Sequence, residues 1–293
     1  MAAPPAGFIR AYRHGSDQKY LSLLVGTTIL CRTAAANQAL FWRNPLVYLW
    51  TILFTIYQAI HHQQDHHHLH QQQLSLLSSI LIRLPFLFAP PLILLVLLNR
   101  ANRNYFHHIL VNTLARPDLR DPVRYYSRPP SLGDHKEESC VQSAIWVLDY
   151  DGRQLGIIAL DLNLDGYQEE LLGPVNQTIL VRHLASAPDF RAAGIDQELL
   201  AHACRLAFQP GSSLTRIVIS VPTPLDPSLQ TALIHLGFHP IRTAPNLADS
   251  PSKVQHTFRN TLLTYLGFPD CHLIWPEQIW VLHRHSFSSD AAE

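Results

Sequence analysis

The stretch that decides the fold is Thr178–Phe208, TILVRHLASAPDFRAAGIDQELLAHACRLAF. Its first eight residues are rich in branched apolar side chains and are too few for a helix of their own, which is typical of a buried strand. From Gly194 onward, apolar residues recur every three or four positions, which is typical of a helix with one apolar face. The stretch therefore predicts a strand, a turn from Ser186 to Gly194, and a helix.

The turn has the composition of an anion-binding site. A strand that turns directly into a helix leaves the first N–H groups of the helix without partners, and the helix dipole adds positive charge there. The small residues Ala192, Ala193 and Gly194 allow a phosphate to approach these groups closely. Arg191 adds a guanidinium that can form a charge-assisted hydrogen bond. The same pattern also fits an ordinary strand–helix unit.

The order Pro188-x-x-Arg191-x-x-Gly194 resembles the acetyl-CoA signature of the GNAT superfamily of N-acetyltransferases, Pro-x-x-(Gln/Arg)-x-x-Gly-x-(Gly/Ala). The resemblance implies that the amides of the turn hold the coenzyme A pyrophosphate. It also implies that the preceding strand separates from its neighbour, so that its backbone holds the pantetheine arm and the thioester carbonyl. The cofactor-binding residues expected on this basis are Leu184, Ser186, Arg191, Ala192, Ala193, Gly194, Ile195 and Asp196.

Two positions depart from the family pattern. Asp196 stands where Gly or Ala is usual, and a carboxylate about 8 Å from a diphosphate charge costs on the order of 2 kcal/mol at an effective dielectric near 20. The sequence His235-Leu-Gly-Phe238 resembles the motif that closes the fourth helix of the family. In the family a tyrosine before that motif acts as general acid, but the matching residue here is Leu233.

Acetyl transfer to an amine requires a base, and His183 is the candidate catalytic residue. It lies on the strand beside the expected thioester, and the pKa typical of histidine suits proton transfer near neutral pH. A buried histidine with a purely structural hydrogen bond is the alternative interpretation. Glu169 and Glu170, in a polar loop, are alternative bases.

Composition limits the class of protein. Of the 293 residues, 47% are hydrophobic and only 15% are charged, so we expect part of the chain in a membrane. The formal net charge is zero, which gives no reason to expect a nucleic-acid partner. The N-terminus lacks the pattern of a cleaved signal peptide. Four widely spaced cysteines indicate reduced thiols that face the cytosol: Cys31, Cys140, Cys204 and Cys271.

Two apolar segments, Pro45–Ile60 and Leu74–Leu98, predict a transmembrane hairpin. Arginines precede the first segment and follow the second, while the link between them has none, so both ends of the hairpin are expected in the cytosol. A pair of buried core helices is the alternative. The link, His61–Gln73, contains six histidines and five glutamines, and we expect a solvated loop there. A metal site is possible in chemical terms, but no ligand spacing supports it.

The remaining elements complete an α/β (α+β) fold with a mixed, mostly antiparallel sheet. We expect a strand at Phe8–Tyr12, a helix capped by Ser16-Asp17 and ending near Ala36, and a β-hairpin around Asp151-Gly152. The helix from Ala101 to Leu114 is followed by an irregular segment, Arg116–Glu138. The expected division is an N-terminal strand and helix at 1–40, the hairpin at 41–100, a juxtamembrane helix and linker at 101–139, and the main part of the GNAT domain at 140–288.

The order of these elements resembles the camello-like, membrane-anchored N-acetyltransferases, whose members include cysteine S-conjugate and endoplasmic-reticulum lysine acetyltransferases. His183-Leu184 matches a His-Leu pair before the coenzyme motif of that group. The resemblance implies transfer of acetyl from acetyl-CoA to an amine on the cytosolic side of the endoplasmic reticulum, where a thin bilayer suits short spans. A catalytically degenerate escort or scaffold protein of that membrane is the alternative. The acceptor, whether small molecule or protein lysine, and the oligomeric state do not follow from the sequence.

Overall fold

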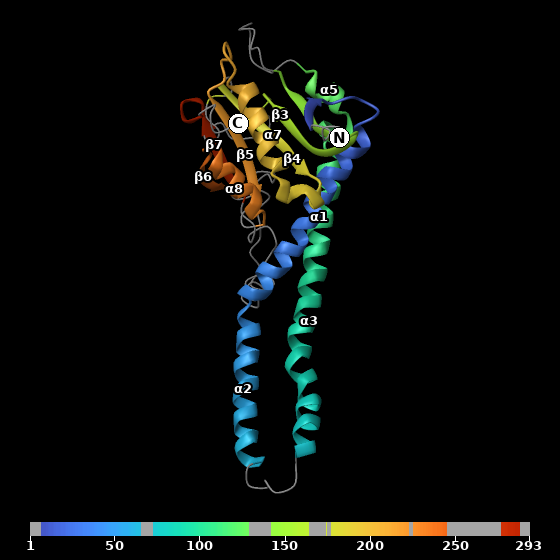
Figure 1. Ribbon diagram of the computed structural model, residues 1–293, viewed down its shortest axis with the longest axis vertical. Helices are drawn as coiled ribbons and strands as arrows, with labels where there is room; N and C mark the ends of the chain where they lie inside the picture. The colour runs from blue at the N-terminus through green and yellow to red at the C-terminus, as the bar shows by residue number, and fades with distance from the viewer. Residues whose placement is uncertain are drawn as a thin grey trace, which may run out of the picture. The chain divides into compact units, whose positions relative to one another are not determined.

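The computed structural model describes residues 7–65, 73–128, 142–163, 174, 177–222, 225–244 and 277–287. The chain divides into two compact units. The first comprises Met1–Arg32, His107–Ser252 and Trp275–Glu293, and the second comprises Thr33–Phe106 and Lys253–Ile274. Figure 1 shows that the first unit holds the β-sheet and that the second holds long helices.

A mixed sheet forms the centre of the first unit. The described residues form seven strands in the order β1-β2-β3-β4-β5-β7-β6. Only β4 and β5 run parallel, and every other neighbouring pair is antiparallel. The predicted mixed, mostly antiparallel sheet is thus confirmed. The strands are β1 (Phe8–Ala11), β2 (Ala144–Tyr150), β3 (Arg153–Asp161), β4 (Thr178–Ser186), β5 (Arg216–Pro222), β6 (His239–Ala244) and β7 (Glu277–His283).

The connection between β2 and β3 is the tight turn that Asp151-Gly152 predicts. Both residues have positive φ, 52° for Asp151 and 74° for Gly152. Two such residues suit the two-residue hairpin turn whose twist matches that of the flanking strands. The β-hairpin predicted around Asp151-Gly152 is therefore confirmed. Strand β3 continues the sheet by pairing with β4 on its other edge.

Two helices, α7 (Ile195–Ala207) and α8 (Pro227–His235), pack on one face of the sheet and build the main hydrophobic core with it. The helix predicted from the 3.6-residue periodicity is α7, and its apolar face is buried except for Leu206, which is partly buried against the core. Residues of this face that are at most 4% exposed are Ile195, Leu199, Leu200, Ala203, Cys204 and Ala207.

Gly156 on β3 determines how closely α7 approaches the sheet. A Cβ atom at this position would lie 2.7 Å from Ile195 Cγ2 and 2.8 Å from Leu199 Cδ1. Both distances are well below ordinary carbon–carbon contact, so a larger residue would displace core side chains. The missing side chain therefore allows the first turn of α7 to lie directly against β3.

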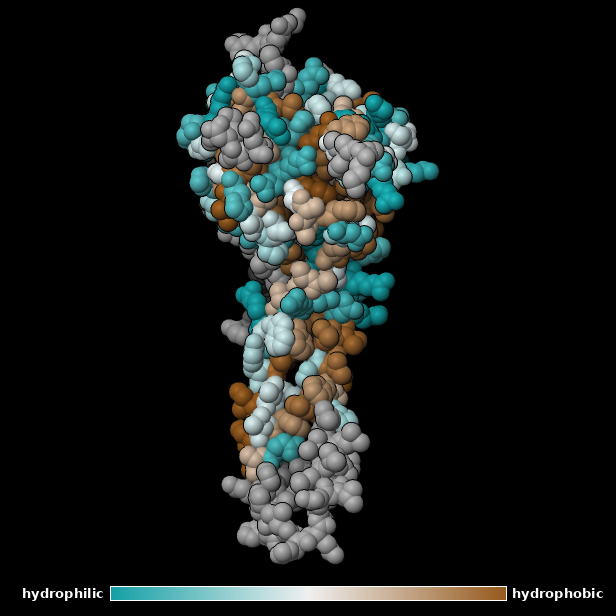
Figure 2. All heavy atoms as spheres, in the orientation of Figure 1, coloured by the Kyte–Doolittle hydropathy of each residue, from teal (hydrophilic) through white to brown (hydrophobic). Residues whose placement is uncertain are grey.

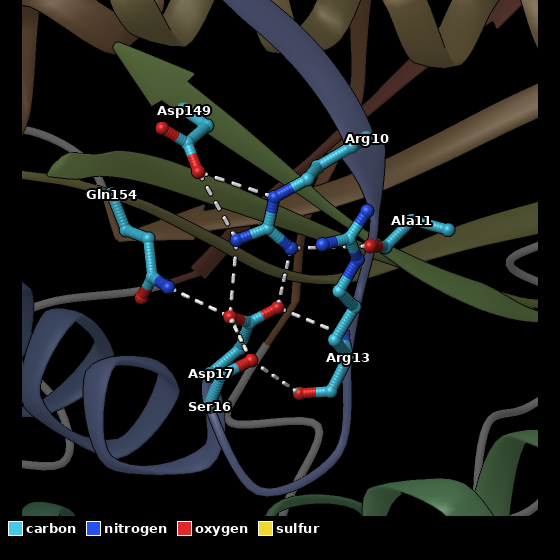
Figure 3. A network of polar contacts seen from close by, with 7 residues as sticks. All are labelled: Arg10, Ala11, Arg13, Ser16, Asp17, Asp149 and Gln154. Carbon is cyan, nitrogen blue, oxygen red and sulfur yellow. Dashed lines mark hydrogen bonds and ion pairs between the residues drawn. The ribbon is translucent and has the colours of Figure 1, made fainter. Parts of the chain in front are cut away.

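A network of polar contacts joins α1 (Gln18–Arg43) to the sheet (Figure 3). Arg10 on β1 binds Asp17 at 2.6 Å and Asp149 on β2 at 3.2 Å. Asp17 also accepts hydrogen bonds from the Arg13 amide at 2.8 Å and from the Gln154 side chain on β3 at 2.7 Å. The Asp17 carboxylate is 1% exposed, so one buried charge connects three strands with the start of the helix.

Several predicted boundaries and side-chain roles differ from the structure. Asp17 stands just before α1, but its carboxylate binds Arg10 and the Arg13 amide. The helix continues to Arg43, past the predicted end near Ala36. The segment expected to be irregular from Arg116 contains two short helices, α4 (Pro117–Arg120) and α5 (Pro122–Tyr126), each starting with a proline. Proline at the first helical position is a common helix start, and this signal was missed.

The second unit contains α2 (Pro45–Asp65), the end of α1, and most of α3 (Gln73–Leu114). Trp50 Nε1 on α2 donates to the Leu87 carbonyl oxygen on α3 at 3.2 Å. Asn37 on α1 exchanges side-chain hydrogen bonds of 2.7 Å with Asn99 and Asn102 on α3. The predicted apolar segments are helical. The second segment and the helix expected after it form one continuous helix.

Described apolar side chains of α2 and α3 are widely exposed. Thirteen large hydrophobic residues on these helices in the second unit have exposed fractions between 37% and 64%, whereas Val47, Leu98 and Phe106 are buried. Figure 2 shows hydrophobic side chains on the surface of this unit. No single helix in the described part of the chain has the length and hydropathy of a membrane span. The two successive helices Gln18–Arg43 and Pro45–Ile60, with a bend of 47° between them, have the length and hydropathy of a membrane span only when they are taken together. The exposed large hydrophobic residues of α2 and α3 in this unit are Tyr48, Leu49, Ile52, Leu53, Ile56, Tyr57, Ile60, Phe88, Leu92, Ile93, Leu95, Val96 and Leu97.

We expect Asp17→Asn to lower the free energy of unfolding by roughly 3 kcal/mol at neutral pH, because Arg10 loses its closest counter-charge in a buried site. Burial acts to raise the pKa of Asp17, but hydrogen bonds from Arg10, the Arg13 amide and Ser16 outweigh it and lower the pKa below its usual value. A carboxyl with a lowered pKa stabilises the fold above its unfolded pKa and loses that contribution as pH falls through the folded one.

Urea unfolding of the full chain at several pH values measures this effect. The difference between wild type and Asp17→Asn should be largest at neutral pH and should shrink as the solution becomes acidic. Asp151→Asn, an exposed carboxylate in the β2–β3 turn, is the matched control and should change stability little. Equal stabilities of the two variants would contradict the role of Asp17.

Candidate functional site

Strand β4 separates from its parallel neighbour before it ends. The two strands pair from Thr178↔Arg216 to Val181↔Ile219 and no further. Beyond Val181, β4 continues to Ser186 and pairs only with β3, while the rest of β5 pairs only with β7 among the described strands. Among the described strands, none therefore lies along this edge of β4 over residues 183–186. The expected separation of these strands is present.

A β-bulge lies where the strands separate. Val181 pairs with Leu160 and His183 with Ala159, so Arg182 is an extra residue on β4. Bulges of this kind change the direction of side chains and occur next to active sites. Arg182 Nε donates to Asp161 Oδ2 on β3 at 2.5 Å. The bulge thus orients Arg182 and His183 toward polar partners in the same part of the molecule.

The turn after β4 is a 3-10 helix, η3 (Pro188–Ala193), followed by Gly194 in the left-handed conformation at φ 80°. None of the η3 residues is buried, and Ala192 and Ala193 are exposed. The first hydrogen bond of α7 runs from the Glu198 amide to the Gly194 carbonyl oxygen at 3.0 Å. In the described part of the chain, the three amides before Glu198 have no backbone acceptor, as expected at a helix start.

Two polar atoms beside these amides also lack partners among the described residues. Ser186 Oγ is buried in a residue that is 1% exposed, and Arg191 Nε is buried in a half-exposed side chain. A buried polar group without a hydrogen bond costs about 1–3 kcal/mol. The amides at the start of α7 and these two side chains together form a cluster of donors, beneath an exposed turn, whose chemistry fits an anionic ligand.

Asp196 does not face the solvent beside this turn. Its side chain is buried at 8% exposure, and burial raises its pKa; nearby Asp226 raises it further, while Arg191 and Arg32 act in the opposite direction. The Ser186 hydroxyl approaches this carboxyl and lowers its pKa, without reaching hydrogen-bond geometry. The sequence analysis treated Asp196 only as a charge near the diphosphate, whereas the structure places it beneath the turn in an environment that disfavours its ionisation.

His183 contacts a carboxylate that the sequence analysis did not identify. His183 Nε2 lies 2.7 Å from Asp118 Oδ2 on α4, and the two side chains are 8% and 1% exposed. Burial acts to raise the pKa of Asp118, but the hydrogen bond to His183, with Arg182 and Arg116 nearby, lowers it overall. Asp118 lies in the segment expected to be irregular, and no local pattern connects it with a residue 65 positions away.

The other predicted site residues contribute in different ways. Leu184 is half-buried and packs against the main core, and Ile195 is 4% exposed, so the side chains of both belong to the core. Leu233, which occupies the position of the family tyrosine, is 0% exposed in the core and supplies no proton. The alternative bases Glu169 and Glu170 lie outside the described residues.

The metal hypothesis gains no support from the described residues. No group of three His, Cys, Asp or Glu side chains among them could hold a metal ion. Residues 61–65 of the expected loop belong to α2, and residue 73 begins α3. Residues 66–72, with the rest of the histidine-rich tract, lie outside the described residues.

Comparison with known proteins gives structural matches alone, since neither a family model nor a curated protein sequence matches the chain. A GNAT family acetyltransferase from Elizabethkingia anophelis with acetyl-CoA bound matches at 15% identity and a TM-score of 0.33, over 48% of this chain and 76% of that one. An IAA acetyltransferase from Bacillus cereus matches at 14% and 0.32, over 48% and 77%. N-acetylglutamate synthase from Neisseria gonorrhoeae, complexed with coenzyme A and N-acetyl-glutamate, matches at 18% and 0.28, over 48% and 26%.

These similarities are low, so we base the functional assignment on the strand pairing and the turn of this chain. The sheet, the early end of the β4–β5 pairing and the exposed turn before α7 together define a site that fits a phosphate-bearing ligand with an extended arm. The solved structures described above carry the names of acetyltransferases and of an N-acetylglutamate synthase.

Replacement of Asp196 tests how the site tolerates this carboxyl. We expect Asp196→Asn to strengthen acetyl-CoA binding roughly 10-fold at neutral pH, because it removes a buried charge close to the bound diphosphate. In the wild type, affinity should fall as pH rises through the raised pKa of Asp196, since the carboxyl then ionises. Titration calorimetry at several pH values measures both effects.

Glu198→Gln is the control, because Glu198 is an exposed carboxylate on the same turn of α7. Solvent screens an exposed charge, so this change should alter affinity much less and leave the pH dependence in place. Weaker binding by Asp196→Asn would show that the carboxyl supports the site.

Proposed function

We propose that this protein is an N-acetyltransferase that moves the acetyl group of acetyl-CoA to a primary amine. The observation that carries the proposal is the strand pairing: β4 leaves β5 after Val181, continues for five residues and enters an exposed turn before α7. Such an arrangement offers a free backbone edge for an extended arm and a cluster of N–H groups for a diphosphate. The edge for the arm comes directly before the N–H groups for the diphosphate along the chain, and the arm and the diphosphate are likewise adjacent in acetyl-CoA.

The residues that would hold acetyl-CoA are those of the turn and of the unpaired edge. The amides that open α7, with Arg191, would bind the diphosphate, and Gly194 permits close approach because it has no side chain. The free edge of β4 from Leu184 to Ser186 would bind the arm and the carbonyl oxygen. Acetyl-CoA supplies an acyl group activated as a thioester.

His183 is the base in this proposal. It lies on the part of β4 that pairs with β3 but no longer with β5, and its ring is held by Asp118. The ring would remove a proton from the acceptor amine as the amine nitrogen forms a bond with the carbonyl carbon. The carbon–sulfur bond then breaks, and the same proton passes to the departing thiolate, so the products are an N-acetyl amide and a free thiol.

A catalytically degenerate escort or scaffold protein of the endoplasmic reticulum is the second candidate. Two observations favour it. Asp196 is buried next to the turn before α7 that would bind the coenzyme, and Leu233 is buried in the core where the family resemblance would place a proton donor. Acetyl-CoA binding without turnover of any amine would support a degenerate enzyme. Absence of binding at millimolar coenzyme would support a scaffold.

Acetyl-CoA titration by calorimetry with the purified full chain tests the transferase proposal directly. We expect binding by the wild type and a roughly 10-fold loss of affinity in Arg191→Ala, which removes a charge-assisted contact. Arg216→Ala is the matched control, because Arg216 is equally half-exposed but lies where β4 and β5 begin to pair. Absence of wild-type binding, or equal losses in both variants, would contradict the proposed site.

The second unit would anchor the protein in a membrane, with the GNAT domain and both termini on the cytosolic side of the endoplasmic reticulum. The observation that supports this is the exposure of apolar side chains on α2 and α3, such as Ile56 at 51% and Ile93 at 60%. Residues 45–60 of α2 contain no charged side chain. Exposed apolar surface of this extent marks an interaction with lipid or with another apolar surface.

Extraction of membranes with alkaline carbonate tests the anchor. The wild type should remain with the membrane, and the double variant Ile56→Lys with Ile93→Lys should be released, since each buried lysine costs roughly 3 kcal/mol at the bilayer centre. Ile234→Lys is the control, because Ile234 is 63% exposed but lies on α8 in the first unit. Release of the wild type itself would contradict the anchor.

A further inference from the structure

The contact between His183 and Asp118 joins two elements that the coenzyme motif does not connect. Asp118 lies on α4, a helix of four residues, and His183 lies on β4 just after the bulge. Their side chains meet at 2.7 Å, and both are almost fully buried. This geometry places a carboxylate directly behind the ring of the proposed base.

The ionisation of Asp118 determines which ring nitrogen carries hydrogen. The pKa of Asp118 is lowered in spite of its burial, mainly by the hydrogen bond to His183, so the group is a carboxylate near neutral pH. An ionised carboxylate only accepts hydrogen bonds. His183 Nε2 must therefore be the donor, and in the neutral ring the free lone pair is on Nδ1.

Nδ1 has no hydrogen-bond partner among the described residues. It is therefore the ring nitrogen left for an acceptor amine, in the part of β4 that has left β5.

The other charged groups around His183 and Asp118 do not replace Asp118 as the partner of the ring. Arg182 is bound to Asp161, and Asp161 also accepts a hydrogen bond from Tyr125 at 3.0 Å. Arg116 acts on Asp118 only as a nearby positive charge. Burial, followed by the charge of Asp118, raises the pKa of Tyr126, which therefore stays neutral. Asp118 is thus the anion in direct contact with the ring.

We propose that Asp118 is the positioning residue for His183: it holds the ring with Nε2 protonated and directs Nδ1 to the proton of the acceptor amine. The inference rests on the proposed acetyltransferase function. When Nδ1 takes the proton, the positive ring is stabilised by the carboxylate behind it. The ring then returns the proton to the coenzyme thiolate, so no other proton donor is required where Leu233 replaces the family tyrosine.

Nitrogen NMR of the full chain with ring-labelled histidine tests the arrangement without any substrate. Comparison with His183→Gln identifies the His183 signals among those of the other histidines. We expect neutral His183 to carry its hydrogen on Nε2 in the wild type and to show a mixture of the two tautomers in Asp118→Asn. Asp118→Glu should restore most of the wild-type signal, because it restores the carboxylate.

The rate of acetyl transfer provides the second readout and is measured as release of free thiol from acetyl-CoA. The candidate acceptors are a polyamine, a lysine peptide and an S-substituted cysteine. We expect Asp118→Asn to lower kcat/KM roughly 100-fold, which is the lower range for loss of a working base, with little change in acetyl-CoA affinity. Asp121→Asn is the matched control, because Asp121 only accepts a hydrogen bond from the Arg124 amide at the start of α5.

The outcomes separate this inference from the proposed function. A wild-type His183 protonated on Nδ1, or one that is unchanged in Asp118→Asn, would overturn the inference in a chain that still binds acetyl-CoA. Equal activity losses in Asp118→Asn and Asp121→Asn would reduce the contact to a structural one. Absence of acetyl-CoA binding, or binding without turnover of any of the candidate acceptors, would overturn the proposed transfer and the base role together.

Discussion

The early end of the β4–β5 pairing is the constraint on which the rest of the site depends. Both strands are in the middle of the sheet, where a backbone edge is normally covered by its neighbour. Here β5 stays with β7 along its whole length, and the bulge at Arg182 turns β4 away. The part of β4 that has left β5, the exposed turn and the first turn of α7 then follow one another along the chain. Buried contacts on both sides of β4 hold this open arrangement.

Local patterns in the sequence were sufficient for the elements of the site but not for their contacts. The apolar periodicity of residues 195–207 and the residues Asp151-Gly152 correctly predicted α7 and the β2–β3 hairpin, because each depends on neighbours in the chain. The contact of His183 with Asp118 and the burial of Asp196 depend on which surfaces pack together, and no local spacing encodes that. Pro117 and Pro122 mark the starts of α4 and α5, but a segment rich in Pro, Asp and Arg also fits an irregular connection.

The two polar clusters of the first unit have different physical roles. Around Asp17 the charged groups are paired with one another, so the cluster fixes β1, β2, β3 and the start of α1. Around the turn before α7, two side-chain donors are buried without partners among the described residues, which costs stability in the free protein. That difference separates a structural network from a site, although both contain arginines and buried aspartates.

The size of the residue at position 156 on β3 affects the start of α7, because Gly156 lies directly against that helix. Its missing Cβ leaves room for Ile195 and Leu199, which are the first core contacts of α7. Because those side chains and the opening amides belong to the same helical turn, added volume at position 156 would change the direction in which the amides point. Natural variants of this strand would therefore alter the affinity of the proposed acetyl-CoA site through packing alone, without a change in any residue proposed to contact the coenzyme.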